Sequence, residues 1–63
     1  MTARAELSSI NSSLDELAQR VSQLAEGLTG RDRDLIGPEL FEVERSLRSA
    51  KRNLSRLIEK ARP

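Results

Sequence analysis

Apolar residues recur at alternating spacings of three and four along both halves of the chain, and polar residues fill the positions between them. This is the pattern of a helix that buries one face. The first half carries Leu7, Ile10, Leu14, Leu17, Val21, Leu24 and Leu28, and the second carries Ile36, Leu40, Val43, Leu47, Ala50, Leu54 and Leu57. The sequence therefore predicts an all-α fold, an antiparallel two-helix hairpin of the coiled-coil type.

Glycine, proline and a candidate cap mark the predicted ends of the two helices. Thr2 is a plausible N-cap, and Gly27 and Gly30 favour the end of the first helix, Gly30 as a left-handed residue after its last turn. Pro38 is tolerated in the first turn of a helix. We expect one domain over residues 1–63, with a first helix at about 3–28, a loop at about 29–37 and a second helix at about 38–61.

Two of these boundaries have alternatives. Most residues at 8–13 are weak helix formers, and Ser13 to Glu16 is itself a capping-box pattern. The first helix therefore begins either at residue 3 or at Ser13, and the heptad phase of Leu7 and Ile10 favours residue 3. The second helix begins either at Pro38 or earlier, at Asp34.

Antiparallel packing of the two apolar rows predicts a register. Layers whose residue numbers sum to 64 pair Leu17 with Leu47 and Leu24 with Leu40. A slip by one heptad is the competing register and requires a longer loop. Ala18 lies beside this predicted seam, either as a solvated flank position or as a place where a third or fourth helix approaches closely.

The composition indicates that the hairpin needs a partner. A chain of 63 residues buries too little of its own surface to be comfortably stable, and such chains usually depend on disulfides, metals or association. The sequence has no Cys and no His, which leaves association. We predict a homodimer in which two hairpins form a four-helix bundle, or docking on a larger protein. The predicted seam and partner surface comprises Leu14, Leu17, Val21, Leu24, Leu40, Phe41, Leu47, Leu54 and Ile58.

The net charge of +1 is divided unevenly, −2 over residues 1–28 and +3 over residues 29–63. Spacings of three, four and four align four bases along one outer face of the second helix: Arg45, Arg48, Arg52 and Arg56. This face is a solvated surface, a site for an acidic protein, or a site for nucleic-acid phosphates. The absence of Trp and Tyr argues against base stacking. Glu44 and Arg48 form a predicted i,i+4 ion pair on the same helix.

The sequence contains no motif that indicates catalysis or ligand binding. With no His, Cys or Tyr and no glycine-rich phosphate loop, we expect no enzymatic activity, cofactor, metal site or small-molecule substrate. No apolar run has the length of a membrane span or of a signal peptide, so we expect a cytoplasmic protein without membrane contact. The expected function is a protein–protein interaction or regulatory module that self-associates through its leucine-rich seams. The alternative is a small nucleic-acid-associated protein that binds phosphates through the basic face.

Overall fold

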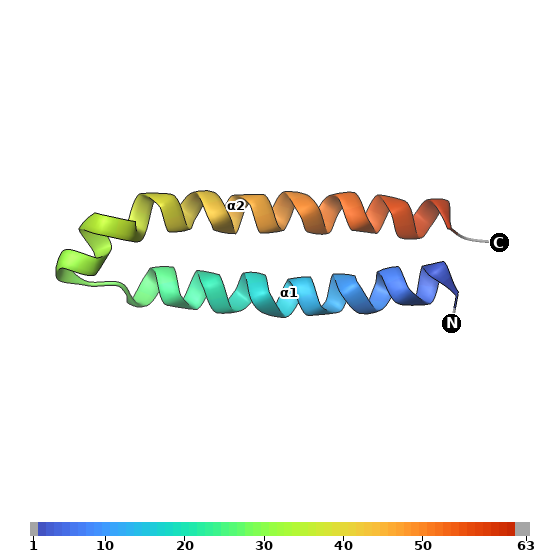
Figure 1. Cartoon of the computed structure of the whole chain (residues 1–63), viewed down its shortest axis with the longest axis horizontal. Helices are drawn as coiled ribbons and strands as arrows, with labels where there is room; N and C mark the ends of the chain where they lie inside the picture. The colour runs from blue at the N-terminus through green and yellow to red at the C-terminus, as the bar shows by residue number, and fades with distance from the viewer. Residues whose placement is uncertain (1, 62–63) are drawn as a thin grey trace.

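A computed structural model describes residues 2–61 as two antiparallel helices (Figure 1). Helix α1 spans Ala3–Gly27 and helix α2 spans Gly30–Lys60. The molecule is elongated, with extents of 51 Å along its longest axis and 15 Å and 12 Å across it. The start of α1 and the end of α2 lie at the same end of the molecule. The predicted helical hairpin is confirmed.

Helix α1 runs without interruption through the serine-rich stretch. Thr2 has an extended backbone, and its Oγ1 accepts a hydrogen bond from the backbone N–H of Ala5 at 3.1 Å. This contact satisfies one of the N–H groups that a helix start leaves without a partner. Of the two starts considered for this helix, the structure has the one at residue 3 and not the one at Ser13.

The turn is much shorter than the sequence predicted. Only Leu28 and Thr29 separate the helices, both with extended backbone, and Gly30 adopts a φ of +58°. The predicted loop over residues 29–37 is therefore wrong, because α2 already begins at Gly30. The left-handed glycine reverses the chain within a few residues. No helix breaker follows before Gly37, and Asp32 in the first turn interacts favourably with the helix dipole.

Pro38 lies inside α2 and accounts for its bend. Proline has no N–H to donate to the carbonyl four residues earlier, and its ring crowds that carbonyl, so a helix bends at this point. Figure 1 shows the first turns of α2, in green, at an angle to the remainder of the helix. This bent segment carries the chain from the end of α1 across to the line of α2.

The two helices face each other through matched stripes of their least exposed positions. Polar side-chain contacts join the helices at two levels within residues 2–61: Asn11 Nδ2 donates to Ser55 Oγ at 3.4 Å, and Lys51 pairs with Asp15. In both contacts the residue numbers sum to 66, which fixes the alignment of the helices. The stripes consist of Leu7, Asn11, Leu14, Ala18, Val21 and Ala25 on α1 and of Leu40, Glu44, Leu47, Lys51, Leu54 and Ile58 on α2.

The predicted seam is wrong about the side of α1 that packs against α2. Ala18 is buried, with 8% of its surface exposed, whereas Leu17 and Leu24 are 47% and 54% exposed. The observed alignment at a sum of 66 differs by two residues from the predicted register of 64, and Ala18, not Leu17, is the residue that packs against α2. Alanine has a short side chain that permits close approach of two helices. Neither expectation for Ala18 holds, because the residue is not on a solvated flank and the helix that covers it is α2 and not a third or fourth helix.

The turn geometry predicts opposite effects of alanine at its two glycines. Gly30→Ala is expected to lower the free energy of unfolding by about 1–2 kcal/mol, because a left-handed backbone brings Cβ too close to the following carbonyl. Gly27→Ala should raise it by about 0.5–1 kcal/mol, because Gly27 is helical and an added Cβ meets nothing within 4 Å. Urea unfolding followed by circular dichroism measures both. Equal effects at the two positions would contradict the turn described here.

Candidate interaction surfaces

The contact between the helices divides the hairpin surface into two broad sides. On α1, Ile10 and Leu17 flank one edge of the stripe, because each lies three residues after a stripe leucine. Asp15 flanks the opposite edge, four residues after Asn11. Asp15 pairs with Lys51, so this second edge of α1 lies on the same side of the hairpin as Lys51 and Ser55. The row of Ile10 and Leu17 therefore lies on the other side.

That other side carries a continuous apolar surface, which we call the apolar face. It is formed by Ile10, Leu17 and Leu24 of α1 and by Val43, Ala50 and Leu57 of α2. The five large side chains of this set are each 46–54% exposed. Ile36, 46% exposed, continues the α2 row by two further turns toward the bend. The rows themselves contain no charged residue, and Arg20 and Glu39 border their outer edge, so the apolar face follows most of the length of the hairpin.

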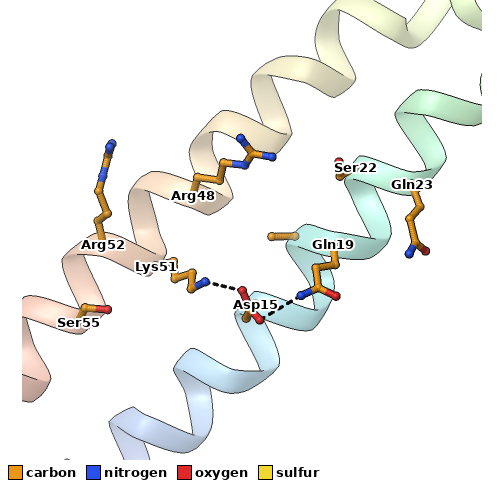
Figure 2. A pocket seen from close by; sticks show the side chains of 9 residues that line it. Asp15, Gln19, Ser22, Gln23, Arg48, Lys51, Arg52 and Ser55 are labelled. Atoms are coloured by element: carbon orange, nitrogen blue, oxygen red, sulfur yellow. Dashed lines mark hydrogen bonds and ion pairs between the residues drawn. The ribbon is translucent and has the colours of Figure 1, made fainter.

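The opposite side carries a polar groove between the helices, with a volume of about 550 Å³ (Figure 2). Its lining residues are Asp15, Ala18, Gln19, Ser22, Gln23, Arg48, Lys51, Arg52 and Ser55. Asp15 accepts hydrogen bonds from Lys51 Nζ and, at 3.3 Å, from Gln19 Nε2. Ala18 and Ser22 are small, which leaves the space between the α1 and α2 side chains open.

The four bases of the predicted basic face divide between this groove and the outer surface of α2. Arg48 and Arg52 line the groove, and Arg48 Nη2 pairs with Glu44 Oε1 at 3.2 Å, which confirms the predicted i,i+4 pair. Arg45 pairs with Glu42 at 3.6 Å on the exposed surface. Arg56 donates to Asn53 Oδ1 and lies outside the groove lining. Arg48 and Arg52 therefore share the groove, whereas Arg56 lines an adjoining hollow with Arg52, Asn53 and Ser55.

The predicted apolar surface residues also separate into three groups. Leu14, Val21, Leu40, Leu47, Leu54 and Ile58 belong to the stripes between the helices, whereas Leu17 and Leu24 belong to the apolar face. Phe41 is 61% exposed and precedes Arg48 by two helical turns, which places it on the polar side. There it borders a shallow hollow of about 480 Å³ with Gly37 and Pro38. Phe41 is thus not part of the apolar face.

Sequence reasoning missed the polar residues that lie between the helices. Glu44 is only 8% exposed, and Lys51 and Asp15 form the ion pair that crosses between the helices. The signal was present in the spacing, since Glu44 follows Leu40 by four residues and precedes Leu47 by three. Because the adjacent residue Val43 also fits the helical phase and is apolar, hydrophobicity alone assigned Val43, and not Glu44, to the contact between the helices.

Within residues 2–61, no helix has both the length and the apolar character needed to cross a membrane. The same part of the chain brings together no group of three or more His, Cys, Asp or Glu residues suited to a metal ion. No family model matches the chain, and comparisons with curated proteins and with solved structures find no match either. Functional interpretation therefore depends on the two surfaces described above.

Enlarging Ala18 distinguishes the observed packing from the predicted seam. Ala18→Leu is expected to lower the free energy of unfolding by about 1–3 kcal/mol, because the added methyl groups have no space between the helices. Ala5→Leu, at an exposed position of the same helix, is the control and should change it by less than about 0.5 kcal/mol. Thermal unfolding at one fixed protein concentration measures both. A tolerated Ala18→Leu would indicate that Leu17 faces α2 instead.

Proposed function

We propose that this chain is a non-enzymatic protein–protein interaction module whose apolar face binds a second copy of itself. The product is a homodimer in which two hairpins form a four-helix bundle. The observation that carries the proposal is the apolar face, because both helices contribute to it and its rows contain no charged residue. Exposure of such a continuous apolar surface to water is unfavourable.

The accessible surface supports the proposal. The hairpin exposes 5112 Å². A compact monomer of the same 7.1 kDa mass exposes about 4,100 Å² by the usual scaling of surface with mass. The excess of about 1,000 Å² is close to the roughly 800 Å² that each partner buries in a standard protein–protein interface. One further hairpin is therefore enough to cover it.

The arrangement of the apolar face favours a second copy as the occupant. Two parallel rows, one from each helix, present the same kind of surface to a two-fold related copy, which is the requirement for an isologous dimer. In the resulting bundle every helix directs apolar residues to the centre, as in other four-helix bundles. Because the rows contain no charged residue and Arg20 and Glu39 border only their outer edge, the two copies can associate without burying an unpaired charge.

A nucleic-acid-binding function through the basic face has less support. Glu42 and Glu44 lie beside Arg45 and Arg48, so carboxylates that would repel phosphates border this face. Helix α1, which forms the other wall of the groove, carries four acidic and two basic residues. A phosphate backbone in the groove would therefore meet opposing charges on the two helices.

The test of self-association is a charge placed in the centre of the apolar face. Leu17→Glu leaves a side chain that is 47% exposed in the single hairpin but would bury two carboxylates in the dimer. We expect the dimer dissociation constant to rise by about a hundredfold or more, equivalent to about 2.7 kcal/mol. Sedimentation equilibrium over a range of protein concentrations measures this constant.

Gln23→Glu is the matched control, since it makes the same charge change at an exposed position of the same helix that lines the opposite side. Its dimer dissociation constant should stay within about threefold of the original, as expected for a surface substitution. Equal weakening by both substitutions, or a monomeric parent chain at all concentrations, would rule out the proposed role of the apolar face.

A further inference from the structure

We infer that the polar groove is a second interaction surface, which binds an acidic helical segment of another protein through Arg48 and Arg52. The groove lies on the side of the hairpin opposite to the apolar face. This inference does not depend on self-association, and both surfaces can be occupied at the same time.

The positive charge of the groove is concentrated on its α2 wall. Arg48, Lys51 and Arg52 line this wall, and Asp15 is the single acidic residue among the lining residues (Figure 2). Lys51 is paired with Asp15. Arg48 shares its charge with Glu44 but keeps 67% of its side chain exposed. Two guanidinium groups therefore remain with donors directed to solvent.

Arg52 has the most available charge of the three. Its Nη2 donates to the neutral hydroxyl oxygen of Ser49 at 3.3 Å, and no carboxylate within residues 2–61 pairs with it. Arg48 and Arg52 lie four residues apart, which is about 6 Å along a helix. Two carboxylates separated by one helical turn match this spacing, and arginine binds a carboxylate in a bidentate manner.

The α1 wall of the groove has a different character. Gln19, Ser22 and Gln23 offer neutral hydrogen-bonding groups, and Ala18 gives the groove a small, apolar floor. From Asp15 to Gln23 this wall is about 12 Å long, or two helical turns. The complementary ligand is acidic along one edge, neutral along the other and about two turns long. An amphipathic acidic helix has these properties.

The same charge distribution favours a protein ligand over nucleic acid. Phosphates in a nucleic-acid backbone are uniformly charged, so both walls of a binding groove would need to be basic or neutral. Here Asp15 lies in the groove, and α1 has two more acids than bases. A peptide can present its carboxylates to α2 alone, and a nucleic acid cannot.

The experiment titrates the intact chain with a capped, alanine-based helical peptide that carries glutamates four residues apart. Backbone amide chemical shifts report both the affinity and the residues affected. We expect shifts at Ala18, Ser22 and Ser55, and binding that weakens with added salt. In Arg48→Gln/Arg52→Gln the affinity should fall at least about tenfold, because both charge-assisted contacts are lost.

Arg45→Gln/Arg56→Gln is the matched control, with the same charge change on the same helix but outside the groove lining. It should retain the peptide affinity within about twofold. Circular dichroism verifies that both variants stay helical, and sedimentation verifies that their association state is unchanged. An equal loss in the two variants would overturn the inference, as would absence of peptide binding. Tighter binding of a single-stranded DNA oligonucleotide than of the peptide would also overturn it, in favour of a nucleic-acid ligand.

Discussion

Each helix of this protein carries an apolar surface that is wider than one neighbouring helix can cover, and the remaining features follow from this constraint. A helix that packs against a single partner needs only a narrow seam, whereas a helix in a bundle needs an apolar arc of about 100° or more. Part of each arc is used between α1 and α2. The remainder, which includes Leu17 and Val43, stays half-exposed on one side of the hairpin.

The contact between the helices is partly polar. Ala18 provides a close approach, and Glu44 and Lys51 occupy stripe positions that apolar residues such as leucine could fill. Polar residues at such positions stabilise less than leucine, but they favour one register over its alternatives. In this hairpin the Asp15–Lys51 pair and the Asn11–Ser55 hydrogen bond join residues that are level with each other in this register, and both lie toward the polar side, away from the apolar face.

The sequence predicted the helices and their antiparallel arrangement, because heptad spacing is the same whichever way a helix is rotated about its axis. It did not predict that rotation. Leu17 and Ala18 are neighbours in the chain, and only their packing against α2 decides which of them is covered. The turn was also mispredicted, because a left-handed Gly30 allows α2 to begin well before Pro38, and proline in a helix bends it without ending it. The groove was not predicted either, because it joins Asp15 and Lys51 from distant parts of the sequence and its position depends on the rotation of both helices.

The claim that a second hairpin covers the apolar face is tested most directly by small-angle X-ray scattering on the parent chain, combined with size-exclusion chromatography. Two hairpins packed face to face have about twice the mass of 7.1 kDa, while the longest dimension stays close to the 51 Å of one hairpin. The account predicts this combination. A particle of single mass, or one of double mass that is about twice as long, would contradict it.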